Sequence, residues 1–293
     1  MSAQIQIGIA GCGLLGSALA DRYLAAGFRV LGFDTDSAAM ARFSGGRAAS
    51  LRDLRDCGRV VLCLPDSRIS AGVLADLDLN AGTIVIDSTT GDPDEMSGLA
   101  KMLAPRGVGY LDACIGGSST QVRAGEAIVI AGGETSVFES CRPLFAAFSA
   151  RTFHAGEAGS GARMKLVLNL VLGLNRAVLA EGLSFARSSG IDPALALEIL
   201  KAGPAYSKAM DAKGRKMLTE DFTPEARLSQ HLKDVRLILD QARQQGRPLP
   251  LSELHRALLE KAEAAGYGAA DNSAIVKAFD FRRKPGTAES PYS

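Results

Sequence analysis

The sequence predicts an α/β fold in which a doubly wound parallel sheet forms an N-terminal domain and an all-α domain follows. Three observations support this prediction. Short β-branched runs alternate with amphipathic helical stretches in the first half of the chain. The first of these runs ends in a glycine-rich turn that opens a helix. Beyond about residue 160, apolar residues recur only with helical spacing.

Four apolar runs in the first half have the length and composition of buried strands. They are residues 4–10, 28–34, 58–65 and 82–89. An amphipathic stretch that is long enough for a helix follows each run. Parallel strands joined through helices form right-handed crossovers, and the helices then cover both faces of the sheet. Near-continuous apolar strands such as RVVLCL fit that environment.

The turn after the first run has the spacing GxGxxG. It consists of Gly11, Cys12, Gly13, Leu14, Leu15 and Gly16. In a Rossmann fold the first glycine makes the tight turn, the second lets a pyrophosphate approach backbone amides, and the third packs helix against strand. A purely structural glycine turn is the alternative. The strand before the turn, the helix after it and Asp34 at the end of the next run favour dinucleotide binding.

Asp34 distinguishes between the two nicotinamide cofactors. A carboxylate at the end of the second strand accepts hydrogen bonds from the ribose hydroxyls and repels the 2′-phosphate of NADP. The expected cofactor is therefore NAD, with NADP less favoured. The alternative is that Asp34 or Asp36 caps the next helix. Asp36 or Ser37 can provide that cap while Asp34 binds ribose.

The second half of the chain is predicted to be helical. A long helix runs from residue 165 to Gly190, and Asp192 before Pro193 is a usual helix start. Further helices are expected at 224–245, 251–265 and 271–281. The expected organisation is an NAD-binding Rossmann domain (1–160), an all-helical substrate and oligomerisation domain (161–283) entered by the long interdomain helix, and a flexible tail (284–293).

Composition argues against several classes of function. The formal net charge of +1, from 33 basic and 32 acidic residues, is not that of a protein that binds nucleic acid or an anionic membrane surface. No uninterrupted apolar segment of about 20 residues is present, and the N-terminus lacks the basic region of a signal peptide. The five cysteines show no metal-ligand spacing and fit a reducing compartment. We expect a cytoplasmic protein without a bound metal.

The long apolar helix contains a lysine and an asparagine. Lys165 and Asn169 are four residues apart and therefore project from the same helical face. A buried ammonium needs a partner or loses its proton. One interpretation is that Lys165 lies in the cleft between the domains and exchanges a proton, with Asn169 binding the same ligand. The alternative is a lysine in the first helical turn that extends to water.

Seven segments in the same order resemble the β-hydroxyacid dehydrogenase family, of which 3-hydroxyisobutyrate dehydrogenase is the familiar member. The segments are GCGLLG (11–16), CLPDS (63–67), IDSTTGDP (86–93), LDACIGGSSTQVRAGEAIVIAGG (111–133), GSGARMKLVLN (159–169), HLKD (231–234) and GYGAADNSAIVKAF (266–279). The resemblance implies that Lys165 is the catalytic acid/base and that Asn169 binds substrate. It implies that a loop holds the substrate carboxylate and that four further residues border the cofactor. The loop residues are Gly116, Gly117 and Ser118, and the cofactor residues are Leu64, Pro65, Thr90 and Lys233.

The resemblance implies hydride transfer between NAD and the β-carbon of a small 3-hydroxy acid, or reduction of the corresponding aldehyde or keto acid. The alternatives are an imine reductase, which usually carries aspartate or tyrosine where Lys165 stands, and a non-catalytic NAD-binding module. The chain departs from the family at Gly116, where a serine commonly contacts the carboxylate, and at Leu168, where asparagine is frequent. Ser118 or Ser119 is expected to replace the missing hydroxyl. Long apolar helices also predict a homodimer or homotetramer.

Overall fold

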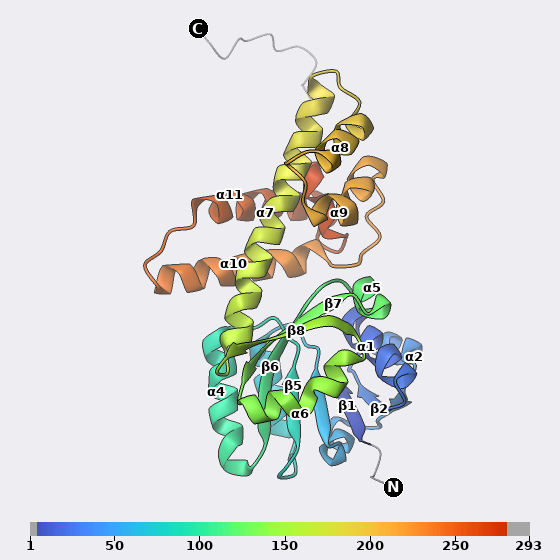
Figure 1. Ribbon diagram of the computed structural model, residues 1–293, viewed down its shortest axis with the longest axis vertical. Helices are drawn as coiled ribbons and strands as arrows, with labels where there is room; N and C mark the ends of the chain where they lie inside the picture. The colour runs from blue at the N-terminus through green and yellow to red at the C-terminus, as the bar shows by residue number, and fades with distance from the viewer. Residues whose placement is uncertain (1–4, 280–293) are drawn as a thin grey trace. The chain divides into compact units, whose positions relative to one another are not determined.

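The computed structural model describes residues 5–279, and the tail predicted at 284–293 lies outside the described residues. The chain divides into two compact units, with the boundary between Asn169 and Leu170. The first unit contains a sheet, and the second is helical (Figure 1). The sequence predicts a boundary at residue 160, where the long helix begins. The first turns of that helix belong to the first unit because they pack directly on the sheet.

The sheet of the first unit has eight strands, and most of them are parallel. The strands are β1 (Gln6–Ala10), β2 (Arg29–Phe33), β3 (Gly46–Arg47), β4 (Arg59–Leu62), β5 (Ile84–Asp87), β6 (Gly109–Gly116), β7 (Ala127–Gly133) and β8 (Ser149–Gly156). Their order is β3-β2-β1-β4-β5-β6-β7-β8. The strands from β3 to β6 are parallel, β7 runs antiparallel to β6, and β8 is parallel to β7. This confirms the predicted doubly wound sheet and adds a reversed pair at one edge.

Helices cover both faces of this sheet. They are α1 (Leu14–Ala25), α2 (Ser37–Arg42), α3 (Ser67–Asp76), α4 (Pro93–Leu103), α5 (Ser119–Ala124) and α6 (Thr135–Ala146), with short 3-10 turns at η1 (Leu51–Asp56) and η2 (Ala104–Arg106). Alternate strand residues enter two separate cores, as the period of a strand requires. Ile84 and Ile86 of β5 pack in one core, and Val85 between them packs in the other. Strands that are buried on both faces explain the unbroken apolar runs.

The longest helix, α7 (Ser160–Ser188), has 29 residues and crosses the boundary between the units. It ends as predicted, because Gly190 adopts a φ of +76° that favours glycine. Within the described residues, α7 alone is long and apolar enough to span a membrane. A core helix meets the same criterion, so this is weak evidence for a span. The polar side chains of Lys165, Asn169 and Arg176 are buried within it.

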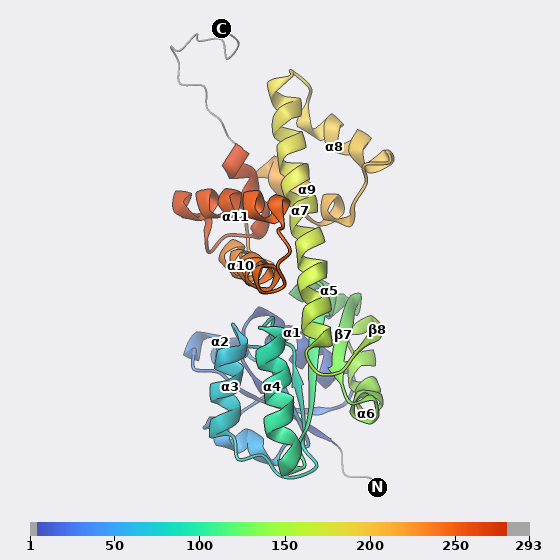
Figure 2. The ribbon, with the colours of Figure 1, turned by 90° about the vertical axis from the view of Figure 1, so that its left-hand side faces the viewer.

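The second unit packs helices against the later part of α7. They are α8 (Pro193–Ala202), α9 (Lys208–Thr219), α10 (Leu228–Gln244) and α11 (Pro250–Ala262), followed by a π turn, η3 (Glu263–Tyr267), and a 3-10 segment, η4 (Asn272–Phe279). In Figure 2, α8 lies on one side of α7 and α11 on the other. The core includes Leu183 of α7, Leu232 of α10, Leu259 of α11 and Ile275 of η4. Helix α9 was not predicted, because five of its twelve residues are charged.

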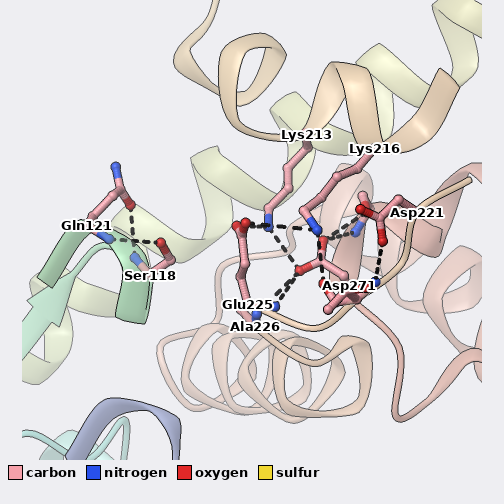
Figure 3. A network of polar contacts seen from close by, with 10 residues as sticks. Ser118, Gln121, Lys213, Lys216, Asp221, Glu225, Ala226 and Asp271 are labelled. Atoms are coloured by element: carbon pink, nitrogen blue, oxygen red, sulfur yellow. Dashed lines mark hydrogen bonds and ion pairs between the residues drawn. The ribbon is translucent and has the colours of Figure 1, made fainter. Parts of the chain in front are cut away.

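A buried ion-pair network joins α9 to the segments around it (Figure 3). Lys213 Nζ donates hydrogen bonds to Glu225 Oε2 at 2.9 Å and to Asp271 Oδ2 at 3.0 Å. Asp271 also accepts hydrogen bonds from the backbone N–H groups of Glu225 and Ser273. Burial alone would raise the pKa of Asp271, but Lys213 and these N–H groups hold it below its ordinary value. We therefore interpret the network as structural, since its charges are paired with one another.

Candidate active site

The glycine turn between β1 and α1 has the geometry that a dinucleotide requires. Gly11 has a φ of +93°, and a Cβ atom there would meet the carbonyl oxygen of Cys63. A Cβ atom on Gly16 would meet the carbonyl oxygen of Gly11. A Cβ atom on Gly13, in contrast, would have no neighbour within 4 Å. The turn is closed at its two outer glycines and open at the middle one, where a phosphate would approach the N-terminus of α1.

Asp34 connects the end of β2 to this turn. Its Oδ2 atom accepts a hydrogen bond from Cys12 N at 2.7 Å, and its Oδ1 atom accepts one from Asp36 N at 2.8 Å. The cap of helix α2 is Asp36, which accepts a hydrogen bond from Ala38 N. Asp34 is therefore not the capping residue. Its carboxylate is held beside the turn, where the ribose of a dinucleotide binds in Rossmann folds.

The ends of β4 and β5 lie beside the glycine turn. Leu64 N donates a hydrogen bond to Thr89 Oγ1 at 3.1 Å. The Leu64 side chain packs beside Gly11, since a Cβ atom added to Gly11 would lie 3.3 Å from Leu64 Cδ2. Pro65 and Thr90 follow Leu64 and Thr89 directly in the chain. The carboxyl ends of neighbouring parallel strands thus bring these predicted cofactor residues to one edge of the sheet, the edge that binds ligands in such folds.

Asp87, which the sequence analysis did not single out, holds the loop after β5. It is fully buried, and its Oδ1 atom accepts a hydrogen bond from Thr89 N at 3.0 Å. Its Oδ2 atom accepts one from the Tyr110 hydroxyl at 3.0 Å. Burial raises the pKa of Asp87 to about 6, although the hydrogen bonds from Thr89, Ser70 and Tyr110 act in the opposite direction. The carboxylate is therefore costly to ionise in the folded protein.

This burial predicts a pH-dependent effect of Asp87→Asn on stability. The folded pKa lies above the unfolded value of 3.8, so wild-type stability associated with Asp87 is complete below about pH 4 and is lost as the pH rises through about 6. The difference corresponds to about 3 kcal/mol. We expect Asp87→Asn to raise the free energy of unfolding at pH 7 by up to that amount and to have little effect near pH 4. Urea unfolding across this pH range measures it, and a pH-independent effect contradicts the prediction.

Helix α7 places Lys165 against strand β6. Lys165 Nζ donates a hydrogen bond to the carbonyl oxygen of Ile115 at 2.6 Å. The lysine is 9% exposed and Asn169 is 7% exposed, so neither extends freely into water. Ile115 precedes the predicted substrate loop at the carboxyl end of β6. The amine therefore lies at the same edge of the sheet as the glycine turn.

The space around Gly116, the last residue of β6, is too crowded for a side chain. A Cβ atom on Gly116 would lie 2.7 Å from Ile128 Cγ1 and 2.9 Å from Leu168 Cδ2. Leu168 thus fills the space that a side chain at position 116 would need. The two departures are therefore coupled, because a larger residue at 116 requires a smaller or displaced neighbour on α7.

Ser118 begins helix α5 with a capping box (Figure 3). Its hydroxyl accepts a hydrogen bond from Gln121 N at 3.3 Å, and its backbone N–H donates to Gln121 Oε1 at 2.9 Å. The backbone N–H of Ser118 is therefore already used within the loop. The hydroxyl keeps its hydrogen for donation to another acceptor, as a substrate carboxylate would be.

Most of the predicted site residues come together in the first unit. The exception is Lys233, which belongs to α10 in the second unit and forms an ion pair with Asp234 at 3.0 Å. Its contact with a cofactor remains a prediction. Sequence reasoning missed Asp87, which holds the loop after β5, and Asp112 of β6, which accepts hydrogen bonds from Gly159 N and Ala162 N at the start of α7. Both are aspartates in otherwise apolar strands, and that contrast was the available signal.

Comparisons with known proteins identify the families of the two parts of the chain. Residues 6–156 match the family described as the NAD binding domain of 6-phosphogluconate dehydrogenase. Residues 159–279 match the family described as NAD-binding of NADP-dependent 3-hydroxyisobutyrate dehydrogenase. Together the two matches cover most of the chain and include both units.

Similar proteins cover nearly the whole chain. The chain is 29% identical to 2-(hydroxymethyl)glutarate dehydrogenase of Eubacterium barkeri, over 96% of each protein. It is 29% identical to L-threonate dehydrogenase of Cupriavidus necator, over 97% of this chain and 99% of the relative. The crystal structure of 3-hydroxyisobutyrate dehydrogenase from Salmonella typhimurium has a TM-score of 0.85 and 26% identity, covering 94% of this chain and 99% of that one. These two matches to pyridine nucleotide-binding domains and the similar hydroxyacid dehydrogenases show that the chain belongs to the β-hydroxyacid dehydrogenase family, whose familiar member is 3-hydroxyisobutyrate dehydrogenase.

Proposed function

We propose that the protein is an NAD-dependent oxidoreductase that transfers a hydride between the nicotinamide and the β-carbon of a small 3-hydroxy acid. Reduction of the corresponding aldehyde or keto acid is the reverse reaction. The observation that carries the proposal is the position of Lys165, whose buried amine lies 2.6 Å from the Ile115 carbonyl oxygen. That carbonyl is at the sheet edge that also carries the glycine turn.

Lys165 is the proton-exchanging group in this proposal. A bound nicotinamide supplies the acceptor or donor for the hydride. In oxidation the lysine amine takes the proton of the substrate hydroxyl, and in reduction the ammonium returns it to the new alkoxide oxygen. The hydrogen bond to Ile115 fixes the direction of the amine. An amine that is held in one orientation lowers the entropic part of the activation barrier, because it is already aligned with the substrate hydroxyl.

The substrate carboxylate binds next to this amine in our proposal. Gly117 and the Ser118 hydroxyl provide donors from the loop after β6, and Asn169 provides an amide one turn beyond Lys165. The names of similar proteins support a small carboxylate, because L-threonate and 2-(hydroxymethyl)glutarate are both hydroxy acids. The Leu168 side chain over Gly116 makes this part of the loop apolar.

Turnover of small hydroxy acids tests the proposed function. The purified protein is mixed with NAD or NADP and with 3-hydroxypropionate, 3-hydroxyisobutyrate, L-threonate or glycerate, and the absorbance of the reduced cofactor is followed. We expect at least one of these acids to reduce NAD. Binding of NADH without turnover of any acid would favour a non-catalytic NAD-binding module. Oxidation of NADPH by a cyclic imine, without hydroxy acid turnover, would favour an imine reductase.

The choice of NAD over NADP rests on Asp34, and it leads to a prediction. The carboxylate beside Cys12 N is an acceptor for ribose hydroxyls and repels a 2′-phosphate. We expect Asp34→Ala to lower the ratio of kcat/KM for NAD to that for NADP by about 10- to 100-fold, as for a lost hydrogen bond to a charged group. Steady-state kinetics with both cofactors measures the ratio.

Asp36→Ala is the matched control for Asp34. It removes the cap of α2 two residues away, which should cost about 1 kcal/mol of stability and leave the cofactor ratio unchanged. If the two variants change the ratio equally, the ribose role of Asp34 is wrong.

We also propose a cytoplasmic homodimer or homotetramer that binds neither nucleic acid nor membrane. Apolar side chains on the second unit support the assembly, since Val178, Phe185 and Ile199 are 66%, 71% and 60% exposed. Val178 and Phe185 are seven residues apart on α7 and so share one face of that helix, as expected of a subunit contact. The near-zero net charge supports the absence of a polyanionic partner. Light scattering of the purified protein gives the number of subunits.

A further inference from the structure

A strand residue, Asp112 of β6, caps the start of α7. Its Oδ1 atom accepts a hydrogen bond from Gly159 N at 2.8 Å, and its Oδ2 atom accepts one from Ala162 N at 2.7 Å. The first N–H groups of a helix have no partner within the helix, and a capping side chain usually satisfies them. Gly159 has no side chain with which to do so. The cap therefore comes from a residue 50 positions away from Ala162.

The same strand also contacts Lys165, through the carbonyl oxygen of Ile115, three residues after Asp112. Asp112 and Ile115 belong to β6, and their partners Ala162 and Lys165 belong to α7. The cap and the lysine contact therefore join α7 to β6 at two points that are three residues apart in each element. They add to the close packing of Gly161 on the backbone of the sheet.

The backbone packs closely around this carboxylate. A Cβ atom on Gly132 would lie 2.6 Å from Asp112 Oδ1, and a Cβ atom on Gly161 would lie 2.5 Å from the Asp112 carbonyl oxygen. Asp112 itself is fully buried. Burial raises the pKa of its carboxyl group, although the helix N–H groups favour the charged form. The two hydrogen bonds from the start of α7 thus offset part of the cost of burying this carboxylate.

We propose that Asp112 is a positioning residue for catalysis, which sets the register of α7 on β6 so that the Lys165 amine meets the substrate hydroxyl. The inference rests on the proposed function, because it assigns proton exchange to Lys165. Asp112 touches neither the amine nor the glycine turn among the contacts of the described residues. Its loss should therefore affect the chemical step and leave cofactor binding unchanged.

The test compares Asp112→Asn with Asp53→Asn. Asparagine keeps the size of Asp112 but sets an amide NH₂ against one of the two helix N–H groups. We expect kcat with the best hydroxy acid to fall about 10- to 100-fold, the effect of a misplaced catalytic group, while the dissociation constant for NADH changes less than about twofold. Asp53 caps η1 through the N–H groups of Ala49 and Ser50, so Asp53→Asn should leave kcat unchanged.

Chemical labelling tests the same inference without turnover. Acetic anhydride is allowed to compete for the lysines, and mass spectrometry gives the rate at each one. We expect Asp112→Asn to raise the rate at Lys165 relative to the exposed Lys101 by at least about threefold, because the amine leaves the Ile115 carbonyl. An equal rise at both lysines indicates general loosening and overturns the proposal.

The outcomes separate the two claims. Wild-type kcat in Asp112→Asn overturns the positioning role, provided that the variant is folded by circular dichroism at the assay temperature. A wild-type protein that turns over no hydroxy acid overturns the proposed function. In that case the labelling ratio still decides whether Asp112 positions the Lys165 amine.

Discussion

Lys165→Ala should lower kcat by about 10²- to 10⁴-fold while NADH still binds, because general acid/base catalysis contributes about that much. The variant loses the only group that we assign to proton exchange, and alanine cannot reach the Ile115 carbonyl oxygen. Among the described residues, no hydrogen bond joins Lys165 to the glycine turn or to Asp34. Stopped-flow or steady-state turnover and quenching of NADH fluorescence measure the two quantities separately.

A lysine of the same unit provides the control for this substitution. Lys101 is exposed near the end of α4, and Lys101→Ala should change neither turnover nor NADH binding. Melting temperatures of both variants show whether the fold is intact. If Lys165→Ala turns over substrate at the wild-type rate, Lys165 is not the acid/base, and the proposed mechanism is wrong.

Gly161→Ala should destabilise the protein by about 3 kcal/mol. An added Cβ atom would lie 2.5 Å from the Asp112 carbonyl oxygen, 2.7 Å from that of Ile130 and 2.8 Å from Gly132 N. These are all backbone atoms of the sheet, so they cannot move aside as a flexible side chain would. The melting temperature should fall by about 6–12 °C in a protein of this size.

Gly182 offers a matched control within the same helix. A Cβ atom there would have no neighbour within 4 Å, and its effect is therefore that of helix propensity alone. We expect Gly182→Ala to stabilise the protein by about 1 kcal/mol. Thermal unfolding by circular dichroism compares the two variants. Similar shifts in the same direction would refute the close packing of α7 on the sheet.

Local patterns were sufficient to predict most elements but not all pairings. The four apolar runs became β1, β2, β4 and β5, and the predicted long helix became α7. The other four strands, β3, β6, β7 and β8, were not predicted, and the reversed direction of β7 depends on partners that the local sequence does not identify. Helix α9 was missed because five of its twelve residues are charged, and its buried Lys213 is paired with Asp271, 58 residues away.

In the candidate site, too, the features that are local in sequence were predicted and the contacts between distant residues were not. The glycine spacing and the pair Lys165 and Asn169 could be recognised from the residues, because each depends on positions that are close in sequence. The contact that holds the lysine is to a main-chain carbonyl, which every residue possesses and no sequence pattern reveals. The cap by Asp112 likewise joins residues about 50 positions apart. Such contacts arise only when the sheet and the helix pack together.

The bond between Asp34 and Cys12 N also bears on attempts to redesign cofactor preference. Replacing Asp34 to admit the 2′-phosphate of NADP removes a carboxylate that accepts a hydrogen bond from the glycine turn itself. An engineer who introduces an arginine nearby therefore also needs a new acceptor for that amide, for example a serine or asparagine at position 34. Without one, the altered enzyme should lose affinity for both nucleotides, because the turn that they share has lost its support.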